Sequence, residues 1–321
     1  MKQKYFLFVS LFALTLGSCQ KDEETNDNNG QPIVNEPVAI QLSGFTIKEG
    51  SSEALETSRV ANAKWEAADM IGVFMLNDGT YNIAGDNANK AYVTELGDGM
   101  FAPVTSDGKD NTIFFPADGA YMDITAYYPY SELDEENRYN LNIADQSVQK
   151  KLDIMRGTPT GLAFNNASPK VDLTFRHKMA KINLTFVAGD GIGEEELKNT
   201  VAELSGFYTK GYYSPIKDNF MIEGDKGKFR ILTAEDGKSA QGTIMPEKQS
   251  SGHSLSITPG YYLEGAPYVF DISEIQGFLS GRSYNYTVTF LRDKITISKS
   301  SVEDWTEGEG ENGTITDDSG N

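Results

Sequence analysis

The residue types that most often carry chemistry are scarce in this sequence of 321 residues. It contains two histidines, His177 and His253, and a single cysteine, Cys19. A three-histidine metal centre or a cysteine-based zinc site needs more ligands than these, and one cysteine cannot build a disulfide framework. We therefore expect no metal, no cofactor and no catalytic residue, and we predict that His177 is a structural histidine.

Two further patterns could suggest a ligand or a reaction. The run Gly189–Gly193 (GDGIG) follows an expected strand, but Glu194 stands where a phosphate-binding loop has its last glycine. Two more glutamates follow Glu194 and would repel a phosphate, so we interpret the run as a β-turn. Paired carboxylates could make a glycosidase, but the sequence does not show which pair would converge. The chain is predicted not to be an enzyme.

Adjacent tyrosines occur at positions 127–128, 212–213 and 261–262. Aromatic faces can stack on sugars, but successive residues of a strand point to opposite faces. We therefore expect one tyrosine of each pair to pack inward.

Composition narrows the class of partner. Asp and Glu number 47 against 28 Lys and Arg, which gives a formal net charge of −19. Such an acidic surface repels nucleic acid, which is excluded as a partner. The chain is long enough to bury one large core or two ordinary ones. The 31 glycines, 16 tyrosines and 17 phenylalanines favour a β protein with many turns.

The N-terminus predicts export. Lys2 and Lys4 precede an apolar run over residues 6–16. As a helix this run rises about 16 Å, well short of a bilayer core of about 30 Å, so residues 1–18 are predicted to be a signal peptide. The run ends in Leu16-Gly17-Ser18-Cys19, which resembles the lipobox of bacterial lipoproteins. The resemblance implies cleavage before Cys19 and lipidation of its thiol. A plain secretory signal with a chance cysteine is the alternative.

Residues 19–37 are polar and are expected to form a flexible acidic tether. Its start, Lys21-Asp22-Glu23-Glu24, resembles the export signal that sends lipoproteins to the outer face of the outer membrane in some Gram-negative anaerobes. An ordinary acidic spacer would look the same. We predict a surface-exposed outer-membrane lipoprotein.

The body of the chain alternates apolar and polar residues between turn clusters, which predicts many short strands. Expected strands cover residues 38–45, 71–76, 112–115, 171–175, 181–187, 254–257, 284–291 and 294–300. Glu194–Glu203 could be a short helix or another strand. We predict an all-β fold of two antiparallel β-sandwich domains, 38–172 and 173–306, followed by an acidic tail over 307–321.

Several distinctive stretches follow one another along the chain. They are Trp65 with Asp69-Met70-Ile71-Gly72-Val73-Phe74, Ala126-Tyr127-Tyr128-Pro129-Tyr130, Asp145-Gln146-Ser147 with Asp153-Ile154-Met155, His177-Lys178 with Ala180-Lys181-Ile182, Met245-Pro246, and Gly281, Tyr284 and Tyr286 with Trp305. They are similar, in the same order, to segments of the fimbrillin family, which supplies subunits of type V pili in Gram-negative anaerobes. The resemblance runs from about residue 38 to 306. Ala68 departs from it, because the family usually has glycine at this position.

The resemblance implies two tandem transthyretin-like sandwiches and a non-enzymatic role as stalk subunit, tip adhesin or membrane anchor of a fimbrium. Its partners would be other pilus subunits, joined by strand exchange, and a host or bacterial adhesion target. Stalk subunits of the family lose an N-terminal strand by cleavage after an arginine. Here Ala39–Ile47 matches that strand and Arg59 matches the cleavage position. A harmless surface arginine is the alternative.

Two hypotheses remain open. No apolar, alternating donor strand is evident after Trp305, so the position of the protein in a pilus is not fixed. The other hypothesis is a monomeric glycan-binding surface lipoprotein. A buried first strand would favour the pilus component, and an aromatic platform exposed on a loop face would favour the glycan-binding protein.

Overall fold

A computed structural model describes residues 36–46, 65–106, 108–161, 164–248, 251–262 and 266–305. Within these residues regular structure is almost entirely β, with twenty-one strands, the four-residue helix α1 (Gln149–Leu152) and two short 3-10 helices, η1 (Glu194–Leu197) and η2 (Gly260–Tyr262). The predicted all-β class is confirmed. No described helix has the length and hydropathy to span a bilayer.

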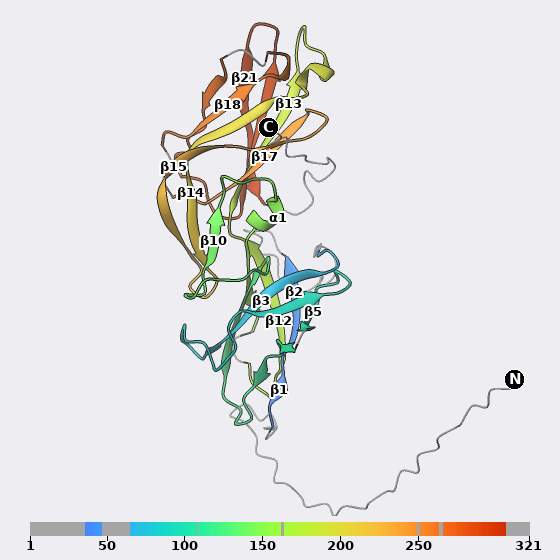
Figure 1. The fold of residues 1–321 in the computed structure, drawn as a ribbon, viewed down its shortest axis with the longest axis vertical. Coiled ribbons are helices and arrows are strands. Elements are labelled where there is room, and N and C mark those ends of the chain that lie inside the picture. The colour runs from blue at the N-terminus through green and yellow to red at the C-terminus, as the bar shows by residue number, and fades with distance from the viewer. Residues whose placement is uncertain are drawn as a thin grey trace, which may run out of the picture.

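The first half of the chain forms a closed barrel, in the lower part of Figure 1. In order around the barrel its strands are β11 (Met155–Pro159), β12 (Lys170–His177), β2 (Gln41–Thr46), β5 (Met100–Pro103), β4 (Lys90–Thr94), β3 (Asp69–Asn77) and β9 (Met122–Tyr128). Two small pairs lie outside it, β1 (Val38–Ala39) with β8 (Phe114–Phe115) and β6 (Thr105–Ser106) with β7 (Lys109–Asp110). The predicted β-sandwich would have two separate sheets in this part of the chain. The structure has one continuous sheet instead, because β2 pairs with both β12 and β5.

The second half, joined by one strand from the first half, forms two five-stranded sheets, in the upper part of Figure 1. One contains β10 (Tyr139–Asn142), β14 (Val201–Ser214), β15 (Asn219–Arg230), β18 (Ser254–Thr258) and β19 (Tyr268–Asp271). The other runs β16 (Leu232–Thr233), β17 (Ser239–Ile244), β13 (Ala180–Ala188), β20 (Arg282–Phe290) and β21 (Ile295–Asp304). Buried residues of both sheets, such as Leu204 and Val288, share one core.

The sheets are mixed, which corrects the expectation of purely antiparallel pairing. β2 pairs in parallel with β12, and β13 pairs in parallel with β20. Parallel partners must be joined by a long crossover; here 123 residues lie between β2 and β12, and 93 between β13 and β20. Alternation of apolar residues marks a strand and its buried face, but it carries no information about the direction of the neighbouring strand.

Strands β3 and β9 separate two cores. Ile71 and Val73 of β3 face the barrel core, whereas Phe74 packs in the second core. On β9, Tyr128 lies in the barrel core and Tyr127 in the second core. Both tyrosines are therefore buried, so burial here extends beyond the one tyrosine of the pair that was expected to pack inward. A strand with protein on both faces has no solvent face to give to the second residue.

The expected domain boundary near residue 172 falls within β12. Tyr139, Leu141 and Leu152 precede this boundary but pack in the second core. The division of the chain into two domains stays a prediction.

Two local expectations around the β14–β15 hairpin are resolved. The ambiguous segment Glu194–Glu203 is the short helix η1 followed by the start of β14. The segment Glu223-Gly224-Asp225 has the composition of a turn but is part of β15, where Gly224 has φ 76° beside a register shift opposite Tyr208 and Lys210. A β-bulge of this kind places a glycine inside a strand.

Candidate strand-exchange site

Strand β2 closes the barrel between β12 and β5, as the blue ribbon in Figure 1 shows. It pairs with β12 over six residues, from Gln41 opposite Lys170 to Thr46 opposite Phe175. It pairs with β5 over only two residues, Leu42 and Ser43. Removal of β2 would therefore leave β12 and β5 as open edges with unpaired backbone groups.

Two apolar side chains at the start of this stretch, Ile40 and Leu42, lie in the barrel core. Ile40 is 6% exposed and Leu42 is 2% exposed. At the buried Gly44, a Cβ atom would lie 2.8 Å from Cε2 of Phe175 and 3.0 Å from Cε2 of Phe101. On the same strand, Ser43 Oγ donates a hydrogen bond to Asp172 Oδ1 of β12. The first strand is thus held by apolar burial, close backbone approach and a side-chain bond.

The side chain of Trp65 holds β2 in the barrel by a hydrogen bond and by aromatic packing. Its indole Nε1–H donates to the carbonyl oxygen of Gly44 at 2.9 Å, which ties the tryptophan to the middle of the strand. The indole is 6% exposed. Its ring meets Phe101, Tyr128 and Phe175 edge-on, with centroids 5.1–5.4 Å apart.

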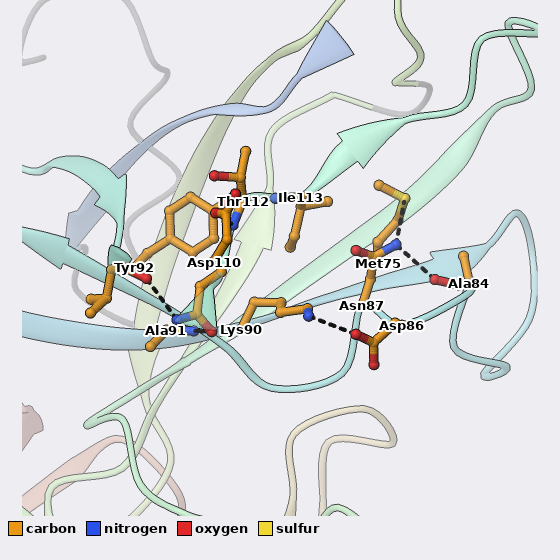
Figure 2. Close-up of polar contacts among 12 residues, drawn as sticks. Met75, Ala84, Asp86, Asn87, Lys90, Ala91, Tyr92, Asp110, Thr112 and Ile113 are labelled. Atoms are coloured by element: carbon orange, nitrogen blue, oxygen red, sulfur yellow. Dashed lines mark hydrogen bonds and ion pairs between the residues drawn. The ribbon is translucent and has the colours of Figure 1, made fainter. Parts of the chain in front are cut away.

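A second anchor lies where the chain enters β2. The Ile40 amide donates to the Ile113 carbonyl at 3.0 Å, and the Ile113 amide donates to the Tyr92 hydroxyl at 2.9 Å. Burial raises the pKa of Tyr92 to about 12, so the phenol stays neutral at physiological pH. Figure 2 shows Tyr92 and Ile113 with nearby contacts that order this side of the barrel, including Lys90 with Asp86. The start of β2 is thereby attached to β4.

Cys19 and Arg59 lie outside the described residues, as does Ile47 at the end of the expected first strand. Trp65 is the first described residue after the segment 47–64, which contains Arg59. Of the sequence-predicted site, the structure therefore describes residues 39–46 of the expected first strand and the barrel strands that pair with it.

The histidines contact neighbouring protein groups. His177 is 5% exposed, with Nδ1 2.6 Å from Asp153 Oδ1 and its ring stacked on Trp305 at 4.5 Å. His253 is 1% exposed, with Nε2 3.3 Å from Glu247 Oε2. Among the described residues, no three or more His, Cys, Asp and Glu side chains are grouped as metal ligands.

A polar cluster joins the barrel to the second half of the chain. Asp218, in the β14–β15 turn, lies 3.0 Å from Arg156 Nη1 of β11 and 2.9 Å from Lys178 Nζ after β12. Tyr213 donates its hydroxyl to Asp218 Oδ1 at 2.8 Å. Burial alone would raise the pKa of Asp218, but the hydrogen bond and charge of Lys178, with the charge of Arg156, outweigh it and lower the pKa.

We expect Asp218→Asn to destabilise the protein by about 1–3 kcal/mol at pH 7, because Lys178 and Arg156 lose their shared carboxylate. The folded pKa is lowered, so this stabilisation is fully present above the usual aspartate pKa of about 3.8. It is lost as the pH falls through the folded pKa. Urea unfolding at pH 7 and below pH 3.8 should therefore show a difference between wild type and variant that shrinks in acid.

Asp190→Asn is the control, because Asp190 is exposed and forms no ion pair with another described residue. This variant should change the free energy of unfolding by less than about 0.5 kcal/mol. A pH-independent effect of Asp218→Asn would show that charge does not hold the junction.

Known proteins resemble the chain over most of its length. A family model described as fimbrillin-like matches residues 58–305. A candidate fimbrium subunit of Bacteroides uniformis, Fim1C, is 30% identical over 316 residues, 97% of each chain.

Two crystal structures share the fold. One is a candidate cell adhesion protein from Bacteroides uniformis, with a TM-score of 0.69 and 28% identity over 84% of this chain and 99% of that one. The other, a candidate cell adhesion protein from Bacteroides ovatus, has a TM-score of 0.65 and 24% identity over 84% of this chain and 98% of that one. Since the family model covers well over half of the sequence and one relative aligns almost end to end, the chain belongs to the fimbrillin-like family.

Proposed function

We propose that this protein is a structural and adhesive component of a fimbrium at the cell surface, and that it assembles by strand exchange at the β2 position. The carrying observation is that the N-terminal strand closes the barrel and is followed by the segment that contains Arg59. The related fimbrium subunit and cell adhesion protein support a role in fimbriae and adhesion rather than in catalysis.

The geometry of β2 suits exchange for a strand of another subunit. A replacement strand would recover the six-residue parallel ladder with β12 and the short ladder with β5. It would also fill the positions of Ile40 and Leu42 in the core. Main-chain hydrogen bonds then supply affinity, and pockets for alternate side chains supply specificity.

The proposal also covers the domain organisation of the chain and the cellular location of the protein. Both halves would be transthyretin-like units, each enclosing one of the two observed cores. A signal peptide over residues 1–18 would be removed, and Cys19 would carry the lipid that anchors the protein in the outer membrane. Lys21-Asp22-Glu23-Glu24 would direct it to the outer face.

Cleavage after Arg59 is expected to convert a monomer into an assembling subunit. Because β2 stays docked after the cut, oligomers should form slowly, as incoming strands displace it. An arginine-specific protease is the right reagent, since Lys48 and Lys64 flank Arg59 and trypsin would cut there too. Arg59→Ala should remain monomeric in size-exclusion chromatography after this treatment. Mass spectrometry should show an acylated Cys19 before cleavage and Val60 afterwards.

Arg230→Ala is the matched control, because Arg230 is exposed on β15 and its loss leaves Arg59 intact. It should form oligomers like the wild type. Oligomers from Arg59→Ala would show that Arg59 is not the switch. Confirmed cleavage of the wild type without oligomers would exclude polymerisation through this groove and favour an anchor or tip role.

A further inference from the structure

A half-open pocket of about 550 Å³ lies between three loops that are far apart in sequence. The connection between β3 and β4 contributes Tyr81, and the segment before β10 contributes Asn137 and Arg138. The β14–β15 turn contributes Lys217, and the first residue of β15 is Asn219. The volume falls within the range of about 300–1,000 Å³ that is common for small-molecule sites. None of these residues belongs to β1 or β2, so the pocket is separate from the strand-exchange site.

The pocket combines an exposed ring with free polar side chains. Tyr81 is 65% exposed, although large apolar and aromatic side chains in this fold are mostly buried. The carboxamides of Asn82, Asn137 and Asn219 line the same pocket and form no hydrogen bond with another described residue. Lys217 lines it too, without a carboxylate partner among the described residues. These groups are available to a ligand.

The loops that carry these groups are ordered by their own hydrogen bonds. In the β3–β4 connection, Asn77 donates its amide to the carbonyl of Asn82 at 2.9 Å. Before β10, Asp134 accepts the backbone amides of Glu136 and Arg138 at 3.0 and 2.9 Å. A pocket that exists before binding loses little conformational entropy when it is filled.

The chemistry of the lining selects one class of ligand. Carboxamides both donate and accept hydrogen bonds, as adjacent sugar hydroxyls require, and an ammonium group donates to hydroxyl or ring oxygens. The exposed face of Tyr81 offers a flat apolar surface for the C–H face of a sugar ring. A peptide would instead use an open strand edge or a continuous apolar groove, whereas polar side chains outnumber apolar ones here.

We propose that this pocket binds a short oligosaccharide, with one sugar ring on Tyr81 and its hydroxyls on Asn82, Asn137 and Asn219. Lys217 adds donors at the rim. The site gives the protein a glycan-recognition activity of its own, which does not depend on cleavage at Arg59 or on strand exchange.

The test is binding of the intact, uncleaved chain to an array of immobilised oligosaccharides of defined structure, followed by titration of the strongest binder in solution. Tyr81→Ala should weaken that binding about five- to tenfold, because the stacking surface is lost. Tyr81→Phe keeps the ring and should bind within about twofold of the wild type. Lys217→Gln should weaken binding further when combined with Tyr81→Ala.

Leu96→Ala is the matched control, because Leu96 is 81% exposed on the β4–β5 loop and does not line the pocket. It should bind as the wild type does. The proposal is overturned if no oligosaccharide on the array binds, or if Tyr81→Ala binds as tightly as the wild type. Binding to an immobilised peptide library but to no oligosaccharide would assign the pocket to peptides and would also overturn it.

Discussion

Trp65→Ala is expected to lower the free energy of unfolding by about 3–5 kcal/mol, the usual cost of removing a large buried aromatic side chain. Three aromatic rings lose their edge-on contacts with the indole. The carbonyl of Gly44 also loses its hydrogen-bond donor, which leaves a buried acceptor unpaired in the middle of β2. Equilibrium unfolding in urea measures the loss.

Leu96→Ala serves as the reference for this measurement, since Leu96 is highly exposed and should change stability by less than about 0.5 kcal/mol. A loss below about 1 kcal/mol for Trp65→Ala would contradict the packing described here. In that case the indole could not be the element that holds β2 in the barrel.

Gly44→Ala should have the second large effect, on the rate of assembly. Its Cβ would lie within 3.0 Å of Phe175 and Phe101, and overpacking of this kind costs about 1–3 kcal/mol. The strain acts only while β2 is docked, so it raises the population of the undocked strand by about five- to 140-fold. After cleavage at Arg59, oligomers should therefore appear about tenfold faster by size-exclusion chromatography.

Gly193→Ala is the control for the change from glycine to alanine. A Cβ at Gly193 would meet only a side-chain oxygen of Glu196, at 3.6 Å, and the position lies far from β2 in the sequence. Assembly should proceed at the wild-type rate. Unchanged assembly by Gly44→Ala would mean that release of β2 does not limit exchange.

Alternation predicts most clearly the strands whose two faces differ in burial. Residues 171–175, 181–187 and 284–291 correspond to β12, β13 and β20, whose burial alternates along most of each strand. Alternation could not predict the long β14–β15 hairpin, because β15 is largely exposed at the sheet edge and contains a bulge. It also could not predict that β3 and β9 have buried residues on both faces, since that depends on which elements pack outside the barrel.

The family resemblance predicted more of the site than patterning alone. It marked the first strand, and the structure shows β2 within that range, held by Trp65 of a second family segment. It also marked Ala68 as a departure from glycine. Ala68 has φ 69°, a left-handed conformation that glycine adopts without steric cost.

No sequence pattern predicted the polar cluster around Asp218 or the pocket at Tyr81. Asp218 meets Arg156 and Lys178 only because the β14–β15 turn folds back onto the barrel. Tyr81 and Asn219 are separated by more than a hundred residues, and each resembles an ordinary loop residue by itself. Such sites arise from tertiary contacts that single-sequence patterns do not contain.

The parallel pairing of β2 with β12 also decides how the molecule carries mechanical load. β12 leads almost directly into β13, so tension on the second half of the chain passes to β12. β1, which precedes β2, lies at the end of the long axis in Figure 1 that is opposite to the second half. A pull along that axis draws the two parallel strands past each other in shear. The evenly spaced hydrogen bonds of their six residue pairs are then strained together, instead of opening one at a time from the end. The strand in the β2 position is therefore oriented to resist extraction by traction along the molecule.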